Sequence, residues 1–448
     1  MKKNDRLRLT CDALGAELEG VCRTREGLPV FVPGMLPGET AEVVLTRVQP
    51  RFAFGRRVGE LQSRSPQRRN DSCPAYPRCG GCNGRHMRYA ATLAAKRDQV
   101  RACFDRIAKL AFDVPEVIGM AEPFHYRNKT ALPVAGTADA PVVGFFAPRS
   151  HTVIPADDCL NAMVPSGAIC GAFLGWVRDH RIDPYREEAH AGLLRHLVIR
   201  VNRKHEAMVT VVINGDTLPF ADDLFERLKG HRVTSLGISI NKDRTNVIFG
   251  RSFRTLFGSG VLTDELCGLR FELAAASFFQ VNPTQTEVLY GCAKDFAALS
   301  GDELVADVYC GAGTISLMLA QAARQVIGIE IVPQAIDNAR QNAKRNGIGN
   351  ARFELGAAEQ VLPALVAQGL RPDVVVVDPP RKGLDPAVID AMAAAAPQRV
   401  VYVSCNVATQ ARDAALLAAK GYRLTRMQPV DMFCWTAGVE NVAAFERC

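Results

Sequence analysis

A cysteine at the end of an apolar run is the residue of this sequence best placed to act as a nucleophile. The run VVYV, residues 400–403, is followed by Ser404, Cys405 and Asn406, and then by a segment with helical spacing. A thiol beside a helix amino terminus has a lowered pKa, and its thiolate adds readily to an electron-poor ring. We therefore expect Cys405 to be a catalytic nucleophile. The alternative is a buried cysteine that fills the core, which is the commoner role of this residue.

Two further segments carry residues suited to a nucleotide-like cofactor. DVYCGAG, residues 307–313, places two glycines at a strand-to-helix turn, where the backbone can approach a ligand closely. Glu330 ends the next strand, about 20 residues on, where an acid can bind a ribose diol. Ser316 stands in place of the third glycine of the dinucleotide motif, and a later strand ends in Asp378-Pro-Pro. These features favour S-adenosylmethionine over NAD, with Asp378 at the reactive end of the cofactor.

A methyl donor beside a thiolate predicts methylation of a pyrimidine at carbon 5. That carbon is too weak a nucleophile to accept a methyl group directly, but addition of a thiolate at carbon 6 makes it nucleophilic. Methyl transfer then leaves a proton on carbon 5 that a general base must remove. Glu440, at the turn into the last apolar segment, is our candidate for this base. A surface acid at the start of a strand is the alternative.

Regular alternation of strands and helices from about residue 285 onward predicts the element that positions these residues. Such alternation is typical of a parallel, doubly wound sheet, in which ligands bind at the carboxyl ends of the strands. We expect an α/β protein of three parts. Residues 1–65 form an OB-like β-barrel, residues 66–265 form a central α+β domain, and residues 266–448 form a Rossmann-like domain.

A cysteine-rich loop inside the second part suggests a metal site. CPAYPRCGGC spaces Cys73, Cys79 and Cys82 as C-x5-C-x2-C in a loop rich in proline and glycine. A tetrahedral thiolate site needs a fourth ligand. Cys159 in PADDCLN is the best distant candidate, while the nearby His86 would favour zinc. The spacing alone does not separate zinc from an iron–sulfur cluster.

Charge and hydropathy point to a nucleic acid partner outside a membrane. The 448-residue chain carries a net charge of +7, and between Arg47 and Arg69 lie seven arginines and one acid. This segment is a candidate phosphate-binding patch, with Phe52 and Phe54 available for stacking, although a solvated basic face is equally consistent with it. The sequence has neither an apolar run long enough for a membrane span nor a signal peptide. We expect a cytoplasmic protein.

The chain resembles the RNA 5-methyluridine methyltransferases along essentially its whole length. Five segments stand in that family's order: SFFQVNPTQTEVLY, DVYCGAG, VVVVDPPRKGL, YVSCNVATQARD and VDMFCWTAGVE. The resemblance implies an S-adenosylmethionine-dependent enzyme with Cys405 as nucleophile and Glu440 as base. The residues that it implies for cofactor binding are Gln280, Tyr309, Glu330 and Asp378. The chain departs from the family at Gly438, where many members have a histidine, and at Val407, where proline is usual.

The amino-terminal half resembles the ribosomal RNA branch of this family. GLPVFVPGMLPGE, residues 27–39, resembles the TRAM-type RNA-binding barrel of that branch. The same branch carries a 4Fe–4S cluster on cysteines spaced as they are here. The resemblance therefore implies Cys73, Cys79, Cys82 and Cys159 as cluster ligands. We expect a monomer that methylates a uridine of large-subunit (23S) ribosomal RNA.

Three alternatives remain open. A transfer RNA uridine methyltransferase is the nearest, although that branch usually lacks the barrel and the cysteine loop. A methyltransferase acting on exocyclic amines would carry an aromatic residue after Asp-Pro-Pro, where this chain has Arg381, and would need no cysteine. A non-catalytic RNA-binding protein would tolerate replacement of Cys405 without loss of function.

Overall fold

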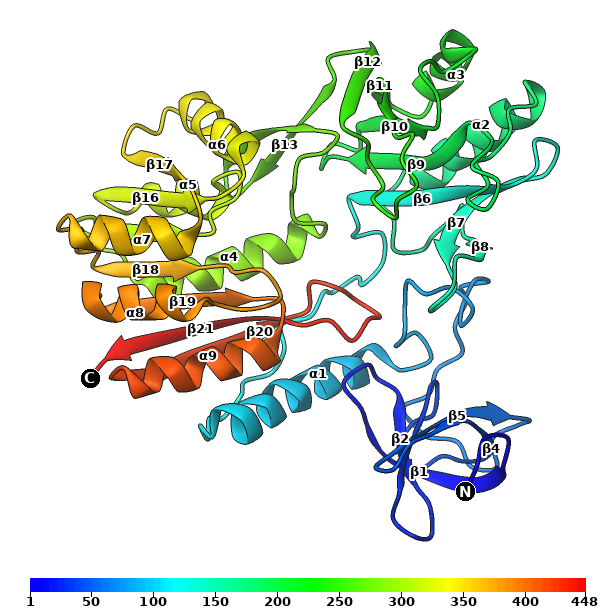
Figure 1. Ribbon diagram of the computed structural model, residues 1–448, viewed down its shortest axis with the longest axis horizontal. Helices are drawn as coiled ribbons and strands as arrows, with labels where there is room; N and C mark the ends of the chain where they lie inside the picture. Colours follow the sequence, from blue (N-terminus) through cyan, green and yellow to red (C-terminus); the bar gives the residue numbers. More distant parts are fainter.

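The computed structural model describes residues 1–448 and is built from one closed barrel, two seven-stranded sheets and a two-stranded sheet. The barrel contains the amino terminus, and the sheet that ends the chain lies on the other side of the molecule (Figure 1). In this view the central sheet lies above the barrel and to the right of the carboxyl-terminal sheet. The predicted α/β class with an amino-terminal barrel is confirmed.

The barrel forms because its strands alternate buried and exposed residues. Its strands are paired in the order β1-β2-β3-β5-β4. In β4 every second residue from Ala41 to Leu45 is buried, and these residues pack on buried residues of β1 and β3 such as Leu9 and Val30. Their bounds are β1 Arg6–Leu14, β2 Gly20–Arg23, β3 Pro29–Val32, β4 Thr40–Val48 and β5 Ala53–Val58.

The central sheet has the order β12-β11-β10-β9-β6-β7-β8 and packs against helices α2 and α3. The strand β10 is buried along its whole length and pairs antiparallel with β9. The strands are β6 Lys129–Gly136, β7 Pro141–Phe146, β8 Val153–Pro155, β9 Leu194–Val201, β10 Ala207–Ile213, β11 Val233–Ile240 and β12 Ser252–Phe257. The helices are α2 Ser166–Asp179 and α3 Ala221–Lys229.

The carboxyl-terminal sheet has the order β17-β16-β15-β18-β19-β21-β20. Its strands are β15 Leu304–Val308, β16 Gln325–Glu330, β17 Ala351–Leu355, β18 Val374–Val377, β19 Arg399–Ser404, β20 Tyr422–Val430 and β21 Glu440–Arg447. The pairs from β17 to β19 are parallel, whereas β21 lies antiparallel between β19 and β20. Because β21 alone runs in the opposite direction to the other strands, its first residue lies at the edge of the sheet where the parallel strands end.

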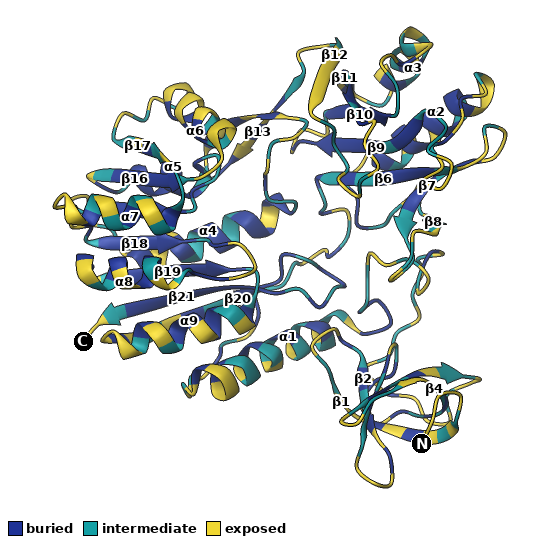
Figure 2. Ribbon diagram, in the orientation of Figure 1, coloured by how far each residue is buried: buried dark blue, intermediate teal, exposed yellow.

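Helices cover both faces of this sheet, as a parallel sheet requires. In β18, Val374 and Val376 pack in the hydrophobic core on one face of the sheet, and Val375 and Val377 pack in the core on the other face. Figure 2 shows the strands buried and the exposed residues gathered on the outer sides of the helices. The helices are α4 Pro283–Ala297, α5 Thr314–Ala320, α6 Pro333–Arg345, α7 Ala358–Ala367, α8 Pro386–Ala395 and α9 Val407–Ala419.

A helix from the amino-terminal half also packs on this sheet. The helix α1, Tyr89–Cys103, continues into the π-helix η1, Phe104–Ala108, and both lie against α9 (Figure 1). Val100 and Phe104 share a core cluster with Tyr402 of β19. A hairpin of β13, Val261–Leu266, and β14, Leu269–Ala274, leads from the central sheet into α4 and packs on the opposite face. The longest helices are too short or too polar to cross a membrane.

Candidate active site

A cavity of about 1270 Å³ lies at the carboxyl ends of β15, β16, β18 and β19. It extends from these strand ends to the linker after β14 and to residues of β11 and β12 in the central sheet. Six residues singled out from the sequence line this one cavity: Gln280, Tyr309, Glu330, Asp378, Cys405 and Glu440. The structure therefore brings together side chains from six separate stretches of the chain.

The turn after β15 has a backbone conformation that depends on glycine. Gly313 caps the amino terminus of α5 with φ +80°, and a side chain there would meet the Cβ of Ala339 at 3.0 Å. Glu330 closes the turn from the neighbouring strand, because the N–H of Gly311 donates to its Oε2 (3.1 Å) and the N–H of Val332 donates to its Oε1 (2.9 Å). The turn and the helix terminus thus present backbone N–H groups and a carboxylate to the cavity, a set that suits a nucleoside ligand.

Ser316 has a structural role in place of the missing glycine. Its hydroxyl donates to Oδ2 of Asp307 (2.5 Å), and both residues are fully buried below the turn. The Oδ1 of Asp307 has no hydrogen-bond partner in the protein, and burial raises the pKa of this carboxyl to about 7. Asp307 in turn contributes to raising the pKa of Asp378, also to about 7, although burial is the larger cause.

Cys405 follows the last residue of β19, at the turn into α9. Asn406 caps that helix, since its Oδ1 accepts from the N–H groups of Ala408 (3.2 Å) and Thr409 (3.5 Å). The pKa of Cys405 is raised, first by burial and then by the charges of Glu440 and Asp378. The expectation that the helix terminus lowers this pKa is therefore wrong for the protein without ligands. The asparagine occupies the helix N–H groups, and two acids face the thiol.

Glu440 is the first residue of β21 and is only 3% exposed. Because β21 runs antiparallel beside β19, its start lies at the level where β19 ends, with Asn441 opposite Ser404. Burial is the main cause that raises the pKa of Glu440 to about 8, and the charge of Asp378 adds to it while Arg381 opposes it. A carboxyl with a pKa near neutrality, facing a thiol across a cavity, can exchange a proton with a bound substrate.

Two cavity residues were not singled out from the sequence. Arg381 is exposed, lines the cavity and lowers the pKa of both Cys405 and Glu440. Its position directly after Asp-Pro-Pro is the feature of the sequence that could have identified Arg381 as a cavity residue. Phe433 lies in the loop before Glu440 and lines the cavity. An aromatic residue in an apolar segment gave no sign that it would face a ligand.

The predicted cysteine ligands lie near one another. The charges of Cys73 and Cys159 contribute to raising the pKa of Cys79, after burial, and Cys159 and Cys79 do the same for Cys82, whose pKa is raised to about 12. The side-chain N–H of Asn161 donates to the Sγ of Cys82 (3.2 Å). However, no group of three or more His, Cys, Asp or Glu side chains is arranged to hold a metal ion.

His86, the alternative fourth ligand, already has one ring nitrogen in a hydrogen bond. Its Nδ1 is hydrogen-bonded to the hydroxyl of Tyr76 (2.5 Å). Burial lowers the pKa of His86 to about 4, with a further contribution from Arg68, and no cysteine is among the causes. The surroundings of His86 are therefore those of a buried, neutral imidazole next to the barrel.

The arginine-rich segment divides into structural and exposed members. Arg68 forms an ion pair with the fully buried carboxylate of Glu39 (2.5 Å), and this pair ties the segment to the barrel. Arg51 is exposed beside Phe52 and Phe54, which are half-buried and pack edge to face with ring centroids 5.6 Å apart. A half-buried aromatic surface with free guanidinium groups around it suits single-stranded nucleic acid.

Comparison with known proteins gives consistent matches over the whole chain. The family described as tRNA (Uracil-5-)-methyltransferase matches residues 262–447, and the TRAM domain matches residues 2–58. An uncharacterised RNA methyltransferase of Halalkalibacterium halodurans is 42% identical over 452 residues, which cover 100% of this chain and 98% of the relative. One of Listeria innocua is 40% identical and covers 99% of this chain and 98% of the relative.

One solved structure aligns over nearly the full length. It is the Pyrococcus abyssi tRNA (uracil-54, C5)-methyltransferase in complex with S-adenosyl-L-homocysteine. The TM-score is 0.79 at 26% sequence identity, and the alignment covers 98% of this chain and 99% of that one. The similarity therefore includes the barrel and the central sheet as well as the carboxyl-terminal domain.

Proposed function

The chain belongs to the RNA (uracil-5-)-methyltransferase family, which uses S-adenosylmethionine, and from this premise we propose that it methylates carbon 5 of a uridine in large-subunit ribosomal RNA through covalent catalysis by Cys405. The observation that supports this best is the position of Cys405, Asp378 and Glu440 on one cavity with the glycine turn. A methyltransferase acting on an exocyclic amine has no use for a thiol and a second buried acid there.

The residues of the glycine turn fit the cofactor. Glu330 would bind the ribose diol, and Gln280, Tyr309 and Asp378 would complete the contacts around it. Burial and the charge of Asp378 raise the pKa of Glu440, and both acids line the cavity, so a sulfonium cation bound beside them would favour their ionised forms. When bound, S-adenosylmethionine supplies the electrophilic methyl group that carbon 5 of the uracil takes up.

The side chains of the cavity account for the remaining steps. The Cys405 thiolate adds its electron pair to carbon 6, and the displaced π electrons make carbon 5 nucleophilic. After carbon 5 has gained the methyl group it still carries its proton, which the Glu440 carboxylate removes. The electrons of that C–H bond re-form the double bond between carbons 5 and 6 and expel the Cys405 thiolate. The target uridine has to leave its stack to reach the thiol, so an unpaired or flipped nucleotide is the substrate.

The test of this mechanism uses RNA that carries 5-fluorouridine. Fluorine replaces the proton that the base removes, so the reaction stops at the covalent adduct. Wild-type protein is expected to form an adduct that survives denaturation, and Cys405→Ala is expected to form none. Full methylation of uridine RNA by Cys405→Ala would refute the mechanism. Glu440→Gln is the matched variant, and it is expected to accumulate the methylated adduct on ordinary uridine RNA.

Transfer RNA is the second candidate substrate. The P. abyssi structure is described as a tRNA enzyme and aligns over 98% of this chain, so the barrel by itself does not separate the two substrates. Support for ribosomal RNA comes from the cysteine loop, which resembles that of the ribosomal RNA branch. Parallel methylation of 23S-type ribosomal RNA and of transfer RNA transcripts decides between them. Methylation confined to transfer RNA would refute ribosomal RNA as the substrate.

We further propose that Cys73, Cys79, Cys82 and Cys159 bind a 4Fe–4S cluster, with zinc as the alternative. Two observations support a shared site. The charges of neighbouring thiols contribute to raising the pKa of Cys79 and of Cys82. In addition, N–H groups of Asn161 and Gly81 donate to the sulfur atoms of Cys82 and Cys79.

Visible absorption of the anaerobically purified protein tests the cluster. Wild type is expected to be brown, Cys79→Ser is expected to lose the absorption, and His86→Ala is the control that keeps it. A colourless wild-type protein loaded with zinc would refute the cluster.

A further inference from the structure

The loop between β20 and β21 determines where the proposed base lies. Residues 431–439 lead directly into Glu440, and Phe433 of this loop also lines the cavity. Most of the loop is buried, with Trp435 only 1% exposed. Gly438 provides no side chain to support Glu440, so the loop has to be held by other parts of the chain.

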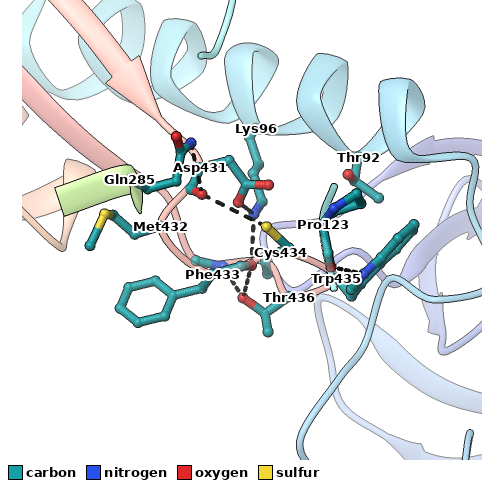
Figure 3. Close-up of polar contacts among 12 residues, drawn as sticks. Thr92, Lys96, Pro123, Gln285, Asp431, Met432, Phe433, Cys434, Trp435 and Thr436 are labelled. Carbon is teal, nitrogen blue, oxygen red and sulfur yellow. Dashed lines mark hydrogen bonds and ion pairs between the residues drawn. The ribbon is translucent and has the colours of Figure 1, made fainter. Parts of the chain in front are cut away.

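Helix α1 holds the first half of the loop (Figure 3). The ammonium group of Lys96 forms an ion pair with the carboxylate of Asp431, and both side chains are fully buried. The same ammonium donates to the backbone carbonyl of Phe433 (3.1 Å), and the hydroxyl of Tyr89 donates to the second oxygen of Asp431 (2.6 Å). This half of the loop is therefore fixed to the face of α1.

The cysteine loop holds the second half. The N–H of Ala437 donates to the side-chain Oδ1 of Asn83 (2.9 Å), and the N–H groups of Asn83 and Gly84 donate to the carbonyl of Trp435 (3.2 and 2.9 Å). Asn83 directly follows Cys82, and its side-chain N–H donates to the carbonyl of Glu17 in the barrel (2.8 Å). One side chain thus joins the barrel, the cysteine loop and the loop before Glu440.

We propose that Asn83 is a positioning residue for proton removal. Its Oδ1 fixes the backbone three residues before Glu440, in place of the support that a side chain at position 438 would give. This inference rests on the proposed function, because it takes Glu440 as the base. The inference also gives the cysteine loop a role in the reaction, because this loop carries the residue that orients the base. That role requires no electron transfer.

The test separates adduct formation from adduct resolution. RNA with 5-fluorouridine stops at the adduct whether or not the base is well placed, so Asn83→Ala is expected to form this adduct at a rate within about twofold of wild type. With uridine RNA, Asn83→Ala is expected to resolve the methylated adduct about 10- to 100-fold more slowly, because a small misplacement of a catalytic group has an effect of that size. The adduct that survives denaturation therefore accumulates.

Two variants make the assignment specific. Asn83→Asp keeps the oxygen that accepts from Ala437 but loses the donor to Glu17, and it is expected to restore resolution to within about threefold of wild type. Asn70→Ala removes an exposed asparagine of the same segment, which contacts Arg64, and is expected to resolve the adduct like wild type.

Three results would overturn the inference: wild-type resolution by Asn83→Ala, equal loss in Asn83→Ala and Asn83→Asp, or slowing of adduct formation and resolution by the same factor. Failure of the wild type to form any 5-fluorouridine adduct overturns the proposed function instead.

Discussion

Replacing Lys96 by methionine is expected to destabilise the carboxyl-terminal domain strongly. Both members of the Lys96–Asp431 ion pair are 0% exposed. Removal of one partner of a fully buried pair leaves the other charge unpaired and costs about 3–5 kcal/mol. A domain has a free energy of unfolding of about 5–15 kcal/mol, so this loss is at least about a fifth of that value. The melting temperature is expected to fall by about 6–20 °C at about 2–4 °C per kcal/mol.

The matched control lies on the same helix. Arg101 and Asp98 form an ion pair three residues apart on α1, but their side chains are 54% and 63% exposed. Arg101→Met is expected to change the free energy of unfolding by about 0–1 kcal/mol, because water screens such a pair. The double variant Lys96→Met/Asp431→Leu removes both buried charges and is expected to recover most of the stability lost in the single variant.

Urea unfolding followed by tryptophan fluorescence measures these differences. The chain has two tryptophans, and Trp435 lies in the loop that the ion pair holds, with its indole N–H donating to the carbonyl of Pro123 (2.7 Å). A Trp176→Phe background isolates its signal. If the free energies of unfolding of Lys96→Met and Arg101→Met differ by less than about 1 kcal/mol, the buried ion pair does not hold the loop.

Four further outcomes are expected. Glu440→Gln removes one of the charges that raise the pKa of Cys405, so the midpoint for alkylation of this thiol by iodoacetamide moves to lower pH. Binding of S-adenosylmethionine at pH 7.5 releases more protons than binding of S-adenosylhomocysteine, which lacks the sulfonium charge. The reason is that a cation favours the ionised forms of acids whose pKa is raised to about 7 or 8. Calorimetry in buffers of different ionisation enthalpy measures this difference. Gly313→Ala weakens S-adenosylhomocysteine binding by about 5- to 30-fold, which corresponds to about 1–2 kcal/mol of strain at a positive φ. Phe54→Ala lowers RNA affinity by about 1–3 kcal/mol, and Arg51→Ala reduces the slope of log affinity against log salt by about 1; filter binding at several salt concentrations checks both.

The shared position of four of the six predicted residues could be foreseen for a simple reason, whereas Gln280 and Glu440 reach the cavity from a linker and from an antiparallel strand. Parallel strands end at one edge of their sheet, so residues at strand ends far apart in sequence meet there. Cys405 and Asp378 end adjacent strands, which pair in register from Val374 and Arg399 onward. Tyr309 and Glu330 follow the same rule. Their chemical roles remain predictions, because position on a cavity does not establish what a side chain does there.

The support of the base could not be foreseen, because no local pattern encodes it. Lys96 and Asp431 are 335 positions apart, and Asn83 and Ala437 are 354 apart. A lysine within a helical segment and an asparagine after a cysteine have many ordinary explanations. Only the packing of α1 on the carboxyl-terminal sheet brings these side chains to the loop before Glu440.

The raised pKa values in the cavity suggest how the proposed nucleophile is kept from reacting too early. A raised pKa means that the protonated form predominates below it, so at neutral pH without ligands Glu440 is largely an acid and Cys405 largely a thiol. Asp378 helps to keep both groups protonated, because its charge contributes to raising the pKa of Cys405 and of Glu440. A cation bound beside Asp378 reverses the balance and favours ionisation of the thiol and the carboxyl together. We therefore expect the ionised forms to be more populated when the methyl donor is bound than when it is not.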